Sequence, residues 1–252
     1  MFMANFVLVP GFWLGGWAWK AVTDILRAKG HAVYPVTLTG LGERVHLGNA
    51  QTNLDTHVSD VVNLIEFEEL DNVYLVGHSY GGVVITAVAD KIPERLAMLI
   101  YADSAPLPDG TATVDFYDAE RLAAFEKAVA TRGDGWRLPL LSWSELDGGD
   151  NLKDLTEKDK NRIEKLATAQ PFNAARQKLS LKNPARRELP KLAILSTRPA
   201  AQGKELIDSG APLFQELADP ILTFVELPTG HYPMFSRPEE LSEILIKSVL
   251  PK

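Results

Sequence analysis

The segment LVGHSYGGVV, residues 75–84, sets a serine between two apolar runs of different character. The preceding NVYLV is typical of a buried strand, and the following GGVVITAVAD is typical of a buried helix. Gly77-His78-Ser79-Tyr80-Gly81 matches G-x-S-x-G, a sharp strand-to-helix turn with no room for side chains at its two glycines. The segment predicts that this turn presents Ser79 as a nucleophile; the alternative is a glycine-rich turn with an incidental serine.

Short β-rich runs alternate along the chain with longer segments of helical spacing. The expected strands are residues 6–10, 31–38, 72–77, 96–102, 192–196 and 221–227. Apolar stripes at helical spacing fall on two further segments, one with Leu54, Val58, Val61, Val62 and Ile65, the other with Leu241, Ile244, Leu245 and Val249. This alternation predicts an α/β fold with a mostly parallel sheet flanked by helices.

The alternation stops after Tyr101 and resumes near Lys191. The residues between them mix helical stretches with glycine, proline and aromatic residues, and a structureless loop of such length is uncommon in a compact domain. We predict that residues 1–106 and 189–252 form the core and that residues 107–188 form a small helical cap over one edge of the sheet. The alternative is a solvated decoration of the core.

Composition limits the partners. The chain has 252 residues, 46% of them hydrophobic, and a formal charge of −7, so it lacks the basic surface that nucleic acids or anionic membranes require. The absence of cysteine excludes disulfides, thiol nucleophiles and thiolate metal sites. The N-terminus MFMANFVLVPG has neither the charge nor the apolar length of a signal peptide, so we expect a cytoplasmic protein acting on a small molecule. The oligomeric state stays open, a homodimer included.

A serine needs a base, because its hydroxyl is a poor nucleophile near neutral pH. His31 opens a strand, at the wrong edge of the sheet, and His57 is expected on the polar side of its helix. His78 belongs to the turn itself, and His46 lies in a loop at the correct edge without a clear placement. His231, in LPTGHYPMF after the last expected strand, is the predicted base.

The base must be oriented by an acid, which holds the reactive tautomer. Such an acid is expected at the end of one of the two strands between serine and histidine. The earlier strand, LAMLIYADS, ends at Asp103, whereas the later one meets no carboxylate until Glu205 and Asp208. We predict Asp103, and Glu205 and Asp208 stay open as alternatives.

An acyl-transfer enzyme also needs two amide donors for the oxyanion. One should come from Tyr80, directly after the serine, and the other from VPGFWLGGW after the first strand, where Phe12 follows the flexible Gly11. A glycine-rich connection without a catalytic role would look the same in sequence.

Together these segments resemble the α/β-hydrolase superfamily, in particular plant methylesterases and hydroxynitrile lyases and their bacterial relatives. The similar segments are FVLVPGFWLGGWAW, TLTGLGERVHL, VGHSYGG and LPTGHYPMFSRPEEL, in the family's order. The resemblance implies a Ser-His-Asp hydrolase with a helical cap over an apolar pocket and no cofactor or metal. By position, it assigns the catalytic and oxyanion roles to Ser79, His231, Phe12 and Tyr80.

The chain departs from the family pattern at three places. Pro10-Gly11 replaces the common His-Gly of the oxyanion loop, and STRP, with Pro199, replaces the plant segment that carries the acid. Tyr232 follows His231 where the lyases carry a lysine that stabilises cyanide, and a neutral phenol cannot supply that positive charge.

The resulting hypothesis is a carboxylesterase that cleaves a small apolar or aromatic ester or lactone through an acyl-enzyme on Ser79. The expected substrate-binding residues are Trp13, Phe172, Tyr232 and Met234, with Phe116, Tyr117 and Trp143 of the insertion as further candidates. Two alternatives are a lyase or C–C bond-cleaving enzyme on the same scaffold, and a ligand-binding protein with a vestigial triad.

Overall fold

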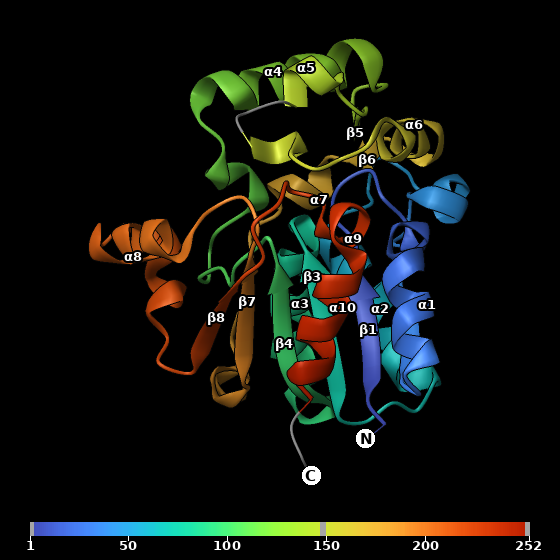
Figure 1. Ribbon diagram of the computed structural model, residues 1–252. Coiled ribbons are helices and arrows are strands. Elements are labelled where there is room, and N and C mark those ends of the chain that lie inside the picture. The colour runs from blue at the N-terminus through green and yellow to red at the C-terminus, as the bar shows by residue number, and fades with distance from the viewer. Residues whose placement is uncertain (1–2, 147–149, 250–252) are drawn as a thin grey trace.

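A parallel sheet forms the centre of the molecule (Figure 1). The computed structural model describes residues 3–146 and 150–249. In these residues six strands form one sheet in the order β2-β1-β3-β4-β7-β8, and every neighbouring pair is parallel. The strands are β1 (Asn5–Val9), β2 (Ala32–Pro35), β3 (Val73–His78), β4 (Leu96–Ala102), β7 (Lys191–Leu195) and β8 (Leu222–Glu226). Each overlaps its predicted segment, and the predicted α/β class is confirmed.

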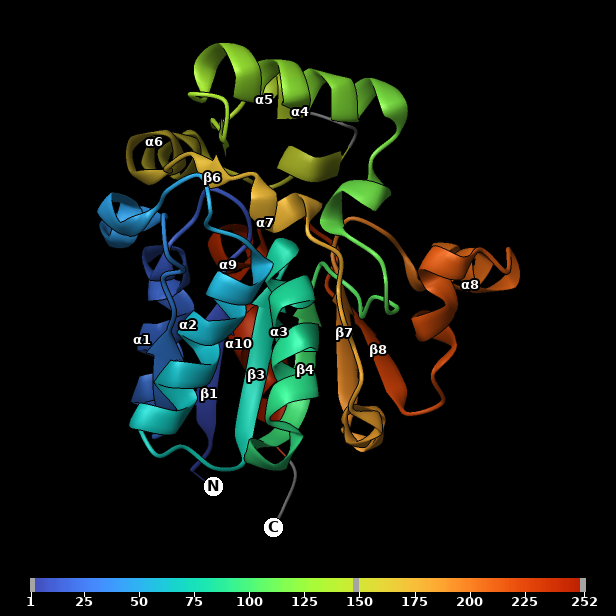
Figure 2. The same cartoon turned by 180° about the vertical axis from the view of Figure 1, so that it is seen from behind.

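Helices cover both faces of the sheet. Helices α1 (Lys20–Ala28) and α10 (Pro238–Lys247) lie on one face (Figure 1), and α2 (Leu54–Phe67) and α3 (Tyr80–Lys91) lie on the other (Figure 2). Neighbouring side chains of β1 enter opposite cores, Val7 beneath α2 and α3, and Leu8 beneath α1 and α10. Since both faces of the central strands β1, β3, β4 and β7 are buried, these strands are rich in apolar residues, whereas the edge strand β8 is largely exposed.

Helix α2 shows how local sequence fixes an element. Its N-cap Asn53 accepts a hydrogen bond from the Thr56 amide at 3.0 Å, and the Thr56 hydroxyl accepts one from the Asn53 amide at 3.4 Å. This reciprocal cap satisfies amides that have no partner inside the helix. The predicted stripe follows, with Leu54, Val58 and Ile65 buried against the core.

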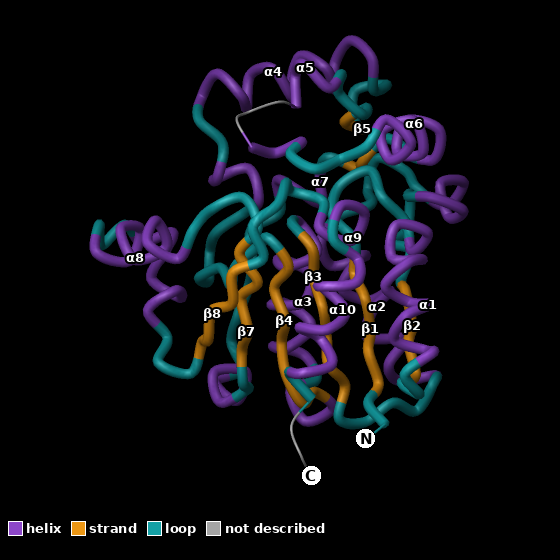
Figure 3. Tube along the Cα trace, in the orientation of Figure 1, coloured by secondary structure: helices purple, strands orange, loops and turns teal. Residues whose placement is uncertain are grey.

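The segment between β4 and β7 lies above the carboxyl ends of the strands (Figure 3). It contains α4 (Ala119–Arg132), α5 (Trp143–Leu146), α6 (Glu157–Leu166), α7 (Asn173–Arg176) and an antiparallel pair of two-residue strands, β5 (Arg137–Leu138) and β6 (Gln170–Pro171). Two-residue strands are too short to give a periodicity, so the sequence did not indicate them. The exact division into a core and a cap at residues 106/107 and 188/189 stays a prediction.

Short elements complete the chain. Helix α8 (Ala200–Asp208) follows β7, and α9 (Pro233–Ser236) follows β8. The 3-10 helices of the described residues are Gly16–Trp19, Gly42–Leu47, Pro93–Arg95, Thr113–Phe116, Asp150–Leu152, Pro184–Glu188 and Pro212–Ala218.

Three histidines are buried. His31 accepts a hydrogen bond from the Ala4 amide at 3.3 Å, at the amino end of the sheet. His57 is fully buried, so its predicted place on the polar side of α2 is wrong; the ring points inward because it finds two polar partners there. Burial lowers the pKa of His57 to about 4 and that of His78 to about 3.

These histidines make stability depend on pH. Between pH 6.5 and pH 4 the unfolded chain binds protons at His57 and His78 that the folded chain does not bind, so the free energy of unfolding decreases as the pH falls. At pH 5 we expect a loss of about 2 kcal/mol for each of the two residues relative to pH 7. Urea unfolding followed by circular dichroism at pH 5, 6 and 7 measures this loss.

The variant His57→Asn removes one of these groups and should make the free energy of unfolding depend less steeply on pH. A variant whose free energy of unfolding has the same slope against pH as the wild type would contradict this assignment.

Candidate active site

Ser79 lies at the turn from β3 to α3, with a φ of 51° that only glycine adopts readily. Two glycines permit the tight packing around it. A Cβ on Gly77 would lie 2.5 Å from the Gly81 carbonyl oxygen, and one on Gly81 would lie 2.5 Å from the Val9 carbonyl oxygen. The turn therefore has the tight backbone packing that G-x-S-x-G predicts.

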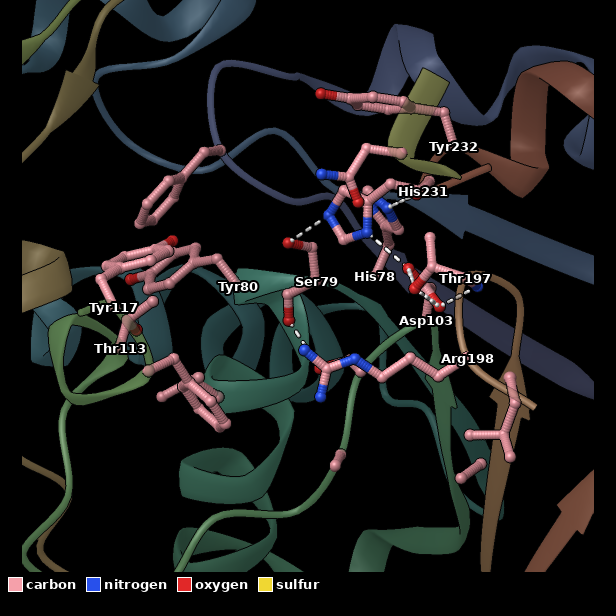
Figure 4. A pocket seen from close by; sticks show the side chains of 18 of the residues that line it. His78, Ser79, Tyr80, Asp103, Thr113, Tyr117, Thr197, Arg198, His231 and Tyr232 are labelled. Atoms are coloured by element: carbon pink, nitrogen blue, oxygen red, sulfur yellow. Dashed lines mark hydrogen bonds and ion pairs between the residues drawn. The ribbon is translucent and has the colours of Figure 1, made fainter. Parts of the chain in front are cut away.

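His231 lies in the loop that follows the carboxyl end of β8, and its side chain contacts Ser79. Its Nε2 is 2.9 Å from the Ser79 Oγ, and its amide donates to the Asn151 carbonyl at 2.8 Å. Figure 4 shows the serine, the imidazole and the Asp103 carboxylate in a row. His46, the alternative base, lies exposed in the 3-10 helix Gly42–Leu47, and no described interaction joins it to Ser79.

Asp103 stands at the carboxyl end of β4 and accepts hydrogen bonds from His231, from the Ser196 and Thr197 amides and from the Thr197 hydroxyl. Its Oδ2 is 2.5 Å from His231 Nδ1, and its Oδ1 accepts the amides of Ser196 at 3.1 Å and Thr197 at 2.9 Å. Burial alone would raise the pKa of Asp103, but the hydrogen bond and charge of His231 and the two amides hold it below its ordinary value. The carboxylate is thus ionised near neutral pH and only accepts hydrogen bonds.

The ionised acid fixes the tautomer of His231. Because Asp103 can only accept, Nδ1 of His231 carries the proton, and Nε2 of the neutral ring accepts from the Ser79 hydroxyl. Glu205 and Asp208, the alternative acids, lie exposed on α8 without a described contact to His231. The structure therefore brings Ser79, His231 and Asp103 together and leaves the two alternatives apart.

Phe12 lies in the loop after β1, and Tyr80 directly follows Ser79. Their rings pack in a tilted arrangement with centroids 4.9 Å apart. Tyr80 is the first residue of α3, where an amide has no partner inside the helix, and neither amide donates a hydrogen bond within the described residues. Both amides therefore lack a backbone acceptor in the described residues, and their role in binding an oxyanion stays a prediction.

A cavity of about 660 Å³ opens above Ser79. Its apolar wall comes from both the core and the segment above the sheet, and includes Phe12, Trp13, Phe116, Tyr117, Phe125 and Tyr232. Arg121 and Arg198 also line it, and the Arg121 guanidinium donates to the Glu145 carbonyl and lies 5.0 Å from the centroid of the Phe125 ring. The charged part of the wall thus lies beside a largely aromatic one.

The four predicted substrate-binding residues separate into two groups. Trp13 and Tyr232 line the cavity, whereas Phe172 and Met234 do not. Phe172 is fully buried against Phe125, and Met234 is buried in the core beneath α1 and α10. The structure thus places Phe172 and Met234 in the apolar core rather than in the cavity, since both side chains find apolar neighbours there.

Some residues at the site were not foreseen in their present roles. Thr197 donates to Asp103 from its amide and its hydroxyl, whereas the sequence of its segment indicates only that an acid is absent there. His78, treated as a variable residue of the turn, donates from Nε2 to the His231 carbonyl at 2.6 Å. The adjacency of β4 and β7 would have suggested the first contact, but strand order is not readable from local pattern.

Among residues 3–146 and 150–249, no group of three or more His, Cys, Asp or Glu side chains is arranged to hold a metal ion. Within the same residues, no helix combines the length and apolar character needed to cross a membrane.

The chain is similar to known esterases. It is 53% identical over 102 residues to the carbendazim hydrolyzing esterase of Nocardioides sp. (strain SG-4G). The alignment covers 40% of this chain and 42% of that protein. It is 30% identical over 121 residues to the putative chloroplastic methylesterase 14 of Arabidopsis thaliana, covering 48% of this chain and 35% of that protein. Each alignment therefore spans less than half of the curated relative.

Among solved structures, an extracellular alpha/beta-hydrolase from a Paenibacillus species superimposes with a TM-score of 0.82 at 25% identity, covering 98% of this chain and 100% of that one. The sequence model of the "Alpha/beta hydrolase family" matches residues 6–244. This match covers nearly the whole chain, and the chain therefore belongs to the alpha/beta hydrolase family.

Proposed function

We propose that the chain is a carboxylesterase that cleaves a small apolar or aromatic ester, or lactone, through an acyl-enzyme on Ser79. The observation that carries the proposal is the continuous pair of hydrogen bonds from Asp103 through His231 to Ser79 at the base of the cavity. A serine activated by an oriented base is the arrangement that nucleophilic acyl transfer requires.

In the proposed reaction, His231 Nε2 takes the proton of the Ser79 hydroxyl as Oγ attacks the ester carbonyl carbon. The carbonyl oxygen becomes an oxyanion, to which the amides of Phe12 and Tyr80 donate. Collapse breaks the bond to the alkoxy group, which leaves as the alcohol with the proton held on His231. Water then attacks the acyl-enzyme with His231 again as base, releasing the acid and restoring Ser79.

The cavity and the relatives support this class of substrate. An aromatic wall removes apolar surface of a small ester from water, which favours binding of apolar acyl or alcohol groups. The names of the Nocardioides esterase and the Arabidopsis methylesterase likewise indicate ester hydrolysis in those proteins. Carbendazim and methyl esters of aromatic acids are therefore the first compounds to test.

Cyanohydrin cleavage is the weaker proposal. Tyr232 lines the cavity next to His231, and burial raises the pKa of its hydroxyl above the ordinary value, so the phenol stays neutral. Such a side chain offers no positive charge to a departing cyanide. Release of an aldehyde or ketone without consumption of water would favour the lyase over the esterase.

Labelling with a fluorophosphonate probe tests the nucleophile. We expect the wild type to be labelled at Ser79 and the Ser79→Ala variant to lose labelling and ester turnover, because the attacking oxygen is gone. Ser59→Ala, on the exposed side of α2, is the control and should be labelled like the wild type. Robust labelling of Ser79→Ala would refute the assignment.

Substitution of the acid tests the orientation of the base. In Asp103→Asn, the amide can donate to His231 Nδ1, which favours the unreactive tautomer, so we expect kcat for a p-nitrophenyl ester to fall by about 10⁴-fold. Glu205→Gln and Asp208→Asn are matched controls that should keep wild-type kcat, because both carboxylates lie on α8, away from His231. Normal turnover in Asp103→Asn with loss in either control would assign the acid to α8.

A further inference from the structure

One buried histidine near the site has no part in the proposed reaction. His57, on α2, faces the side chain of Tyr80 on α3, and its Nδ1 is 2.8 Å from the Tyr80 hydroxyl. Its Nε2 is 2.9 Å from the Thr39 carbonyl oxygen. Both rings are almost fully buried, so this polar contact lies inside the core.

The two contacts fix which atom donates. A carbonyl oxygen can only accept, so His57 Nε2 carries the proton and donates to Thr39. Nδ1 of the neutral ring then has a free lone pair and accepts from the Tyr80 hydroxyl. Burial keeps His57 neutral by lowering its pKa and keeps Tyr80 protonated by raising its pKa, so the direction of this bond does not change near neutral pH.

The hydrogen bonds that link Tyr80, His57 and Thr39 continue to the Asp60 carboxylate. Asp60 accepts from the Thr39 amide at 2.6 Å and from the Thr39 hydroxyl at 2.9 Å, and Arg44 forms an ion pair with the same carboxylate at 2.7 Å. Thr39 is therefore held in place independently of His57. A fixed carbonyl orients the imidazole, and the imidazole in turn fixes the position of the Tyr80 hydroxyl.

Tyr80 carries one of the two proposed oxyanion amides. Its ring is held at the hydroxyl end by His57 and packs on one side against Phe12, the residue that carries the second amide. The peptide between Ser79 and Tyr80 adjoins the strained φ of Ser79, which persists only where neighbouring contacts determine it. The side chains of the two amide-bearing residues are thus tied to each other and to α2.

We infer that His57 is a positioning residue, which acts through the Tyr80 hydroxyl to hold the Tyr80 and Phe12 amides at the place where the oxyanion forms. This inference rests on the proposed esterase function. If the role of His57 and Tyr80 were only structural, their contact would do no more than satisfy two buried polar atoms. The inference adds an effect of this contact on catalysis.

The test compares kcat and KM in Tyr80→Phe, His57→Leu and the double variant. Each single variant should displace the Tyr80 amide without removing it, so kcat should fall by about tenfold, which is less than the loss expected when an oxyanion donor is removed. KM should stay within about twofold of the wild-type value. Since both single variants break the same His57–Tyr80 bond, the double variant should lose no more kcat than either of them. It should also be more stable to heat than His57→Leu, because the Tyr80 hydroxyl that His57→Leu leaves buried and unpaired is absent from the double variant.

Two further variants separate positioning from stability. In His57→Asn the side-chain oxygen can take the place of Nδ1 as acceptor, so kcat should return to within about threefold of the wild type. His31→Leu is the matched control, since it removes a buried histidine with one hydrogen bond at the opposite end of the sheet. We expect it to lower the melting temperature while kcat is unchanged.

A transition-state analogue gives an independent readout. The affinity of a trifluoromethyl ketone analogue of the best ester should fall in parallel with kcat/KM across Tyr80→Phe and His57→Leu, whereas inhibition by the product alcohol should not change. Wild-type kcat in both variants, with Ser79→Ala inactive, would overturn the role of His57 and leave the esterase proposal intact. Absence of both ester turnover and probe labelling in the wild type would overturn the esterase proposal and, with it, this role.

Discussion

The left-handed backbone at Ser79 is the constraint on which the candidate site depends. A non-glycine residue at a φ of 51° carries strain that the surrounding structure must offset. The Val9 carbonyl packs directly against Gly81, and the Ser104 hydroxyl donates to the Ser79 carbonyl at 2.7 Å, so β1 and the chain after β4 both hold the turn. The turn cannot relax without breaking these contacts, and Ser79 therefore stays at the base of the cavity.

The parallel sheet brings the other groups to this turn. Strands β3, β4 and β8 all end at the same edge, where Ser79, Asp103 and His231 follow them. The loop carrying His231 is held from both sides. The Asn151 carbonyl, in the segment above the sheet, accepts a hydrogen bond from the His231 amide, and His78 donates one to the His231 carbonyl. The position of the imidazole therefore depends on the segment that forms the roof of the cavity as well as on the sheet.

Sequence pattern predicted the sheet because buried parallel strands are continuous apolar runs bounded by turns, and the six strands overlap their predicted ranges. It placed His57 wrongly, since helical periodicity assumes that a histidine faces water, and only the tertiary contacts with Tyr80 and Thr39 offset its burial. The sequence pattern likewise did not show that Phe172 and Met234 are buried in the core. An aromatic or thioether side chain near the site fits a core or a cavity equally well, and packing between distant segments decides which one it enters.

The place of the acid shows why strand order matters more than chain order. Asp103 and Thr197 follow β4 and β7, which are neighbours in the sheet, so a carboxylate after either strand could lie beside His231. In this chain Asp103 adopts a φ of 43°, and its carboxylate meets the amides after β7. The segment in which the family resemblance places the acid thus supplies hydrogen-bond donors here. What the fold fixes is an ionised carboxylate beside Nδ1, and two adjacent strand ends can provide it.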